Sequence, residues 1–257
     1  MASLGDPIGV VTVGIWARYA GVRRDLVRHS LDSFRAVERR LSPRLSSPPS
    51  GFVGRPQFSR AIVSEPLIAL TFDDGPDPEN TPPLLDILAN RNVLASFYLI
   101  GEQVSRHPDI ARMTADRGHE IGNHTWSHRF LTLQSTRSIE IELERAHVAI
   151  EAAIGVPPTD LRPPYGAITP ALTRWVDHRF GYRTIVWSID AADWEEPDAD
   201  TITNRLVAGA HPGAVALLHD THATTVDAVA TTVDRLLGEG YRFCTVGEMI
   251  RVSSSLR

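Results

Sequence analysis

Two histidines separated by three residues, His124 and His128, form a candidate metal-binding pair. On a helical turn this spacing places both imidazoles on one face, with their Cβ atoms about 5 to 6 Å apart. Asp74 can supply a third ligand. One carboxylate and two imidazoles leave coordination positions open for water and substrate, as in catalytic zinc sites. These three residues are therefore predicted to hold a catalytic divalent ion.

Asp73 directly precedes the predicted ligand Asp74 in the run Thr-Phe-Asp-Asp-Gly-Pro. Two adjacent carboxylates repel each other when both are buried and ionised, so the pair requires a cation nearby. We expect Asp74 to bind that cation and Asp73 to accept a proton from the attacking water. Gly75 and Pro76 are typical of a sharp turn beside them.

Arg162 begins the run Arg-Pro-Pro-Tyr, which ends at Tyr165. Proline fixes the backbone angle φ, so this segment is predicted to be rigid. The backbone N–H of Tyr165 is then a candidate oxyanion donor. The guanidinium of Arg162 is expected to pair with a carboxylate such as Asp73.

His219 ends an apolar run and is the candidate general acid. A histidine in this setting can protonate a departing group if a carboxylate orients and tunes its imidazole. Asp193 is the candidate carboxylate, and Trp194 is expected to form a wall of the same pocket.

The elements that must position these residues alternate between short apolar runs and longer helical patterns. Seven strands are predicted at 67–72, 95–100, 119–123, 160–163, 182–188, 214–219 and 241–245. Six helices are predicted between them, at 82–89, 108–116, 138–154, 170–178, 200–208 and 226–237. Strands separated by helical crossovers indicate an α/β fold with a parallel sheet, either open and doubly wound or closed into a barrel.

The candidate site residues follow the carboxyl ends of different predicted strands. In a parallel barrel these ends share one rim, so residues far apart in sequence are expected to meet in one pocket.

Composition and charge exclude several other classes of protein. With 257 residues and 42% hydrophobic residues, the chain can bury a full core. Residues 61–257 carry 16 Arg against 27 acidic residues, a net charge of −11, which gives no electrostatic basis for nucleic-acid binding. Cys244 is the only cysteine, so a metal site must be built from histidine and carboxylate.

Residues 1–60 are predicted to be an N-terminal extension, and residues 61–257 the main domain. The extension is basic, with 10 Arg against 4 acidic residues. Its residues 25–41 show the spacing of an amphipathic helix, and residues 42–56 are rich in serine and proline, as in a linker. No signal peptide or transmembrane segment is recognisable, which favours a cytoplasmic enzyme, although a cell-wall substrate would require secretion.

Five motifs in order give the chain a specific resemblance. They are Thr-Phe-Asp-Asp-Gly, His-Thr-Trp-Ser-His, Arg-Pro-Pro-Tyr, Asp-Ala-Ala-Asp-Trp and Leu-Leu-His. This set resembles the polysaccharide deacetylase family, carbohydrate esterase family 4, also called the NodB homology domain. The resemblance covers roughly residues 65 to 250. It implies a distorted (β/α)7-type barrel of parallel strands, in keeping with the seven predicted strands.

The resemblance also implies a role for each site residue. Asp73 is the base, oriented by Arg162, and Tyr165 helps to hold the oxyanion. His219 is the acid, tuned by Asp193, while Trp194 and Leu217 line the acetyl pocket. Asp74, His124 and His128 bind the metal, which is expected to be Zn²⁺, with Co²⁺, Ni²⁺ or Mn²⁺ as alternatives.

The expected reaction is hydrolysis of N-acetyl groups on N-acetylglucosamine units of chitin-like glycans or peptidoglycan. An O-acetyl esterase acting on xylan is the near alternative, since the same attack by water cleaves esters. A catalytically silent carbohydrate-binding protein is the alternative from another class, but such a protein needs neither Asp73 nor His219. The expected partner is an N-acetylated carbohydrate, and the chain is expected to be a monomer.

Overall fold

The computed structural model describes residues 55 and 57–255. The predicted helix at 25–41 and the predicted linker therefore lie outside the described residues, apart from Arg55. Arg55 donates hydrogen bonds to Asp177, and the backbone N–H of Phe58 donates to the carbonyl of Thr184 at 2.9 Å. The start of the described chain is thus attached to the domain that follows it.

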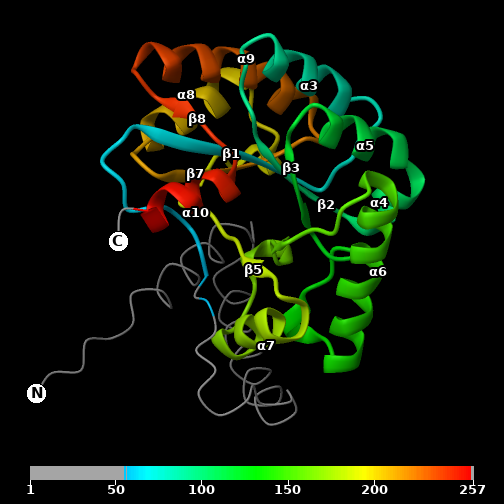
Figure 1. Cartoon of the computed structure of the whole chain (residues 1–257). Helices are drawn as coiled ribbons and strands as arrows, with labels where there is room; N and C mark the ends of the chain where they lie inside the picture. Colours follow the sequence, from blue (N-terminus) through cyan, green and yellow to red (C-terminus); the bar gives the residue numbers. More distant parts are fainter. Residues whose placement is uncertain (1–54, 56, 256–257) are drawn as a thin grey trace, which may run out of the picture.

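Parallel strands with helices around them form the core of the molecule (Figure 1). The eight strands are β1 (Leu67–Asp73), β2 (Ser96–Leu99), β3 (Glu120–Asn123), β4 (Asp160–Leu161), β5 (Arg183–Thr184), β6 (Ile189–Asp190), β7 (Ala214–His219) and β8 (Arg242–Phe243). Their order is β5-β4-β3-β2-β1-β7-β6, and β8 pairs with β1. Every strand pairing in the described residues is parallel. The sheet is the expected distorted barrel, in which β5 and β6 lie at its two ends.

The prediction of one continuous strand at residues 182–188 was wrong. Residues 182–188 form only β5 and the start of a connection to β6. The interruption has a physical cause, because the backbone of Val186 bonds to Phe58 instead of to a neighbouring strand of the sheet.

Helices fill the connections between the strands. They are α3 (Thr81–Ala89), α4 (Gly101–Arg106), α5 (Pro108–Asp116), α6 (Thr136–Ile154), α7 (Pro170–Phe180), α8 (Ala199–Gly209), α9 (Ala223–Gly238) and α10 (Val246–Ser255). Three 3₁₀ turns are η1 (Leu131–Leu133), η2 (Pro164–Gly166) and η3 (Asp193–Glu195). The six predicted helices are present with ends moved by at most three residues. Ser135, Thr169 and Asp198 cap three of them with their side chains.

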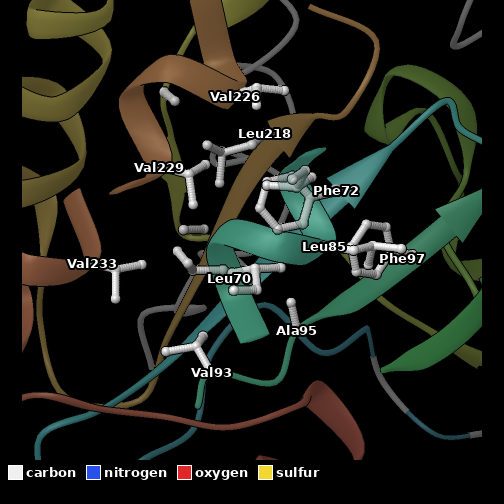
Figure 2. Close-up of a cluster of buried hydrophobic side chains, with 14 of the residues drawn as sticks. Leu70, Phe72, Leu85, Val93, Ala95, Phe97, Leu218, Val226, Val229 and Val233 are labelled. Carbon is white, nitrogen blue, oxygen red and sulfur yellow. The ribbon is translucent and has the colours of Figure 1, made fainter. Parts of the chain in front are cut away.

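The alternation of side chains along β1 separates the core from the site. Ile68, Leu70 and Phe72 point toward the helices, where they pack with residues of α3, α9 and β7 (Figure 2). The alternate positions, including Thr71 and Asp73, face the other side of the sheet. An apolar outer layer therefore fixes the strand that carries the first functional carboxylate.

None of the helices in the described part of the chain is long and apolar enough to cross a bilayer.

Candidate active site

Asp74, His124 and His128 lie together at the carboxyl ends of β1 and β3. One potential ligand atom from each lies within 4.8 Å of the other two. The Nε2 atoms of His124 and His128 are 3.4 Å and 3.3 Å from Oδ1 of Asp74. This brings together the three predicted ligands around a space that a cation can share.

The helical turn predicted for residues 124–128 was wrong. Thr125 and His128 have positive φ values of 68° and 54°, which a right-handed helix does not contain. The segment is an irregular turn, yet both Nε2 atoms point toward Asp74. The side chains converge because of this turn and not because of helical periodicity.

Burial and charge prepare Asp74 and His128 for a cation. Burial acts to raise the pKa of Asp74, but contacts with His124, His128 and His219 outweigh it and lower that pKa, so the carboxylate is ionised. Burial and the neighbouring His124 lower the pKa of His128 to about 4, which keeps this imidazole neutral. Asp74 Oδ1 is buried and has no hydrogen-bond partner. An anionic oxygen in this state fits a site built for a metal.

The second ring nitrogen of His124, Nδ1, is hydrogen-bonded to the backbone. Its Nδ1 lies 2.7 Å from the carbonyl of Arg162, so the Nδ1 proton is donated there and Nε2 faces Asp74. A backbone partner of this kind fixes the tautomer and ring orientation of a metal-binding histidine.

Arg162 forms a buried ion pair with Asp73. The guanidinium is fully buried, and its Nη1 donates to Oδ1 of Asp73 and to Oγ1 of Thr71, each at 2.7 Å. Its Cζ lies 4.1 Å from the centroid of the Tyr98 ring. Asp73 Oδ2 is 3.7 Å from Nε2 of His124, which places the proposed base beside the ligand cluster.

His219 and Asp193 form a buried pair on the other side of Asp74. Nδ1 of His219 lies 2.8 Å from Oδ1 of Asp193, whose Oδ2 accepts from the backbone N–H of His219 and from Thr225 Oγ1. Burial acts to lower the pKa of His219, but Asp193 and the carboxylates of Asp74 and Asp73 outweigh it and raise that pKa to about 10. Nε2 of His219 is 4.0 Å from Oδ2 of Asp74.

Three further predicted residues lie near these side chains in space or in sequence. Tyr165 has a φ of 61°, and its ring packs on Phe130 and on His128, with centroids 3.9 and 4.6 Å apart. Trp194 lines a cavity of about 550 Å³ with residues of β6 and α8. Leu217 is fully buried on β7, two residues before His219. The roles predicted for these three side chains stay predictions.

Sequence reasoning missed several side chains that support the site. Thr71 and Thr225 contact Arg162 and Asp193, respectively. Asp220 is buried behind Gly75 and accepts a hydrogen bond from Thr81 at 2.5 Å. The position of Thr71 two residues before Asp73 on one strand was the available signal, because such residues share a face.

The chain is similar in sequence to known deacetylases. A profile of the polysaccharide deacetylase family matches residues 60–185. The peptidoglycan-N-acetylglucosamine deacetylase PgdA of Listeria monocytogenes is 39% identical over 194 residues, covering 76% of this chain and 41% of that protein. The chain therefore spans about two fifths of the length of that relative. A chitooligosaccharide deacetylase of Rhizobium leguminosarum is 38% identical over 170 residues, covering 66% of this chain and 78% of that protein.

The solved structures include a similar fold. The Bc1960 peptidoglycan N-acetylglucosamine deacetylase, crystallised with 4-naphthalen-1-yl-N-oxidanyl-benzamide, matches with a TM-score of 0.72 and 35% identity. The match covers 74% of this chain and 91% of that one. The chain belongs to the polysaccharide deacetylase family, carbohydrate esterase family 4.

Proposed function

We propose that the chain hydrolyses N-acetyl groups on N-acetylglucosamine units of an oligo- or polysaccharide. The observation that carries this proposal is the pair of proton-transfer candidates beside one ligand cluster. Asp73, held by Arg162, lies next to His124, and His219, held by Asp193, lies next to Asp74. Amide hydrolysis needs both a base for water and an acid for the departing nitrogen.

A divalent ion, which we propose to be zinc, fits the cluster of Asp74, His124 and His128. The fit is supported by the unpartnered buried Oδ1 of Asp74 and by a donor set of one carboxylate and two imidazoles. When bound, the ion supplies Lewis-acid polarisation of the acetyl carbonyl and favours ionisation of water.

Asp73 accepts a proton from the attacking water. The Arg162 guanidinium fixes Oδ1 of this carboxylate, which leaves Oδ2 on the side of His124. Water oxygen then bonds to the acetyl carbon, and we propose that the backbone N–H of Tyr165 donates to the resulting oxyanion.

His219 donates a proton to the sugar nitrogen as the C–N bond breaks. An amine is a poor leaving group, so this protonation is needed for turnover. Asp193 keeps the imidazole charged and oriented through two hydrogen bonds to His219. The electron pair of the broken bond remains on nitrogen, and the products are acetate and a free amino sugar. Trp194 and Leu217 are proposed to line the space for the acetyl methyl group.

The names of the relatives favour N-acetylated glycans as substrates. Those named above are deacetylases of peptidoglycan or chitooligosaccharide.

Acetate release from a panel of substrates tests the proposal. The panel contains N-acetylglucosamine oligomers, peptidoglycan fragments and acetylated xylan, each assayed with and without a chelator. We expect acetate from the N-acetylated sugars only, its loss with the chelator, and its recovery on addition of zinc. Asp73→Asn should abolish turnover while zinc still binds. Acetate release from xylan alone would favour the esterase, and no release from any substrate would favour a silent binding protein.

A further inference from the structure

The turn between His124 and His128 has an unfavourable backbone conformation that contacts with other residues must stabilise. Thr125 and His128 both adopt a positive φ, a region that residues with a Cβ atom rarely occupy. Such conformations persist only where the surrounding contacts impose them. The two proposed ligands, His124 and His128, lie at the ends of this turn. The contacts that fix the turn therefore also determine the orientation of both imidazoles.

Each N–H of the turn from Thr125 to His128 has a side-chain acceptor. Thr125 N–H donates to Oδ1 of Asn123 at 2.7 Å, and His128 N–H donates to Oγ1 of Thr125 at 3.1 Å. The two N–H groups in the middle, those of Trp126 and Ser127, donate to Glu142. Two of these four contacts use acceptors in the turn or next to it in sequence, Asn123 and Thr125. The other two use Glu142, which reaches the turn from α6.

Glu142 engages the turn with both carboxylate oxygens. Oε2 accepts from the N–H of Trp126 at 3.1 Å and from that of Ser127 at 2.8 Å, while Oε1 accepts from Ser127 Oγ at 2.7 Å. Hydrogen bonds to an ionised acceptor are roughly twice as strong as neutral ones. The three hydrogen bonds to Glu142 therefore occupy both backbone N–H groups at the centre of the turn and the hydroxyl of Ser127.

The helix that carries Glu142 is fixed in the core. The flanking α6 residues Ile139, Leu143 and Ala146 are fully buried. One turn further along α6, Arg145 places its Cζ 3.9 Å from the centroid of the Trp126 ring. The turn also contacts α4, whose first N–H groups, from Gly101 and Glu102, donate to the carbonyls of Thr125 and Trp126. Both α4 and α6 therefore hold the turn.

We propose that Glu142 is a positioning residue that holds the 124–128 turn in the conformation that presents His128 to the metal. Its effect on metal binding rests on the proposed function, whereas its effect on the turn does not. Glu142 acts through Trp126 and Ser127, and in the structure its carboxylate binds those two residues and not the ligand atoms.

Three variants of the full chain separate this role from a general effect on α6. Glu142→Ala removes all three acceptor contacts. Glu142→Gln keeps an oxygen for the two backbone N–H groups and can donate from its nitrogen to Ser127 Oγ. Glu144→Ala is the matched control, because Glu144 is an exposed glutamate two residues further along the same helix.

Zinc affinity is measured by competition with a chromogenic chelator, on metal-free protein well below its melting temperature. Residues hydrogen-bonded directly to metal ligands typically contribute 10- to 100-fold to metal affinity. Because Glu142 acts through the turn and not on a ligand atom, we expect Glu142→Ala to bind zinc about 10-fold more weakly. Glu142→Gln should recover most of this loss, and Glu144→Ala should match the wild type. Wild-type affinity in Glu142→Ala would overturn the proposal.

Amide hydrogen exchange in the metal-free protein tests the turn by itself. Glu142→Ala should accelerate exchange at Trp126 and Ser127 at least about 10-fold, without the same change at buried residues of α6. Unchanged exchange would overturn the proposal. If the wild type bound no zinc, the proposed metal site would fail, and the exchange result would still decide whether Glu142 holds the turn.

Discussion

Arg162→Met removes the guanidinium that donates a hydrogen bond to the buried carboxylate of Asp73. Methionine approximates the length and apolar stem of arginine but carries no charge and no donor. Asp73 is 3% exposed and would remain beside Asp74 with its main hydrogen bond lost. We therefore expect a large loss of stability in the metal-free protein.

The size of the loss follows from the contacts that disappear. Arg162 is 0% exposed and makes 2.7 Å hydrogen bonds to Asp73 and Thr71 while it stacks on Tyr98. Breaking a buried ion pair by removing one partner costs about 3 to 5 kcal/mol, because the other charge stays buried. Asp73→Asn combined with Arg162→Met removes both charges, so the double variant should recover roughly half of that cost.

Urea unfolding followed by tryptophan fluorescence provides the measurement, with a chelator present throughout. The free energies of unfolding of the wild type, both single variants and the double variant form a double-mutant cycle. A loss below about 1 kcal/mol in Arg162→Met would show that Arg162 does not neutralise a buried charge on Asp73. So would a double variant whose loss equals the sum of the two single losses, because the two charges would then be independent.

Three further predictions concern other parts of the molecule. Burial and the nearby Arg117 lower the pKa of His119 to about 4, so its stabilising contribution is present above pH 6.5 and is lost as the pH falls toward 4. His119→Asn can still accept a hydrogen bond from the Ala95 N–H but does not titrate in this range. When the pH falls from 7.5 to 5, the free energy of unfolding of this variant should decrease by about 2 kcal/mol less than that of the wild type. Equal decreases for both proteins in urea titrations would contradict this. Gly75→Ala would place a Cβ 2.3 Å from an Asp220 oxygen and should lower the melting temperature. Gly238→Ala is the control, because no atom lies within 4 Å of the Cβ that it would add, and it should not lower the melting temperature. Equal melting temperatures of the two variants would argue against close packing at Gly75. Dialysis against a chelator should abolish acetate release and added zinc should restore it, so activity that survives complete metal removal would exclude the proposed role of the ion.

The strand ends were the predictable part of the site. Polar residues that follow apolar runs, such as Asp73 and His219, had to meet if the sheet was parallel, because one rim collects the carboxyl ends of its strands. The structure places both beside Asp74. Local patterns were sufficient here because each residue needed only its own strand and the common direction of the sheet.

The connection between β5 and β6 was not predictable from local patterns. Residues 182–188 are rich in β-branched and aromatic residues, with Ile185, Val186 and Trp187 in succession, which fits a single strand. The structure interrupts it where the carbonyl of Phe58 accepts from Val186, a contact across more than a hundred residues. Periodicity contains no information on such a distant backbone partner.

The two unpredicted helices have weak local signals. α4 is six residues long and begins after Ile100 without a side-chain cap, and α10 contains Gly247 and several serines. The role of Glu142 was hidden for a related reason. On the sequence it is one of many charged residues on the surface of α6, and only the three-dimensional path of the turn at Trp126 makes it an acceptor.

Anomalous diffraction at the zinc edge can locate a divalent ion bound by Asp74, His124 and His128. Crystals of the full chain soaked in zinc should show one strong peak about 2.0 to 2.2 Å from a carboxylate oxygen of Asp74 and from the Nε2 atoms of both histidines. A zinc-soaked crystal in which Asp74 points away from the imidazoles, with no peak shared by the three side chains, would exclude a common metal site.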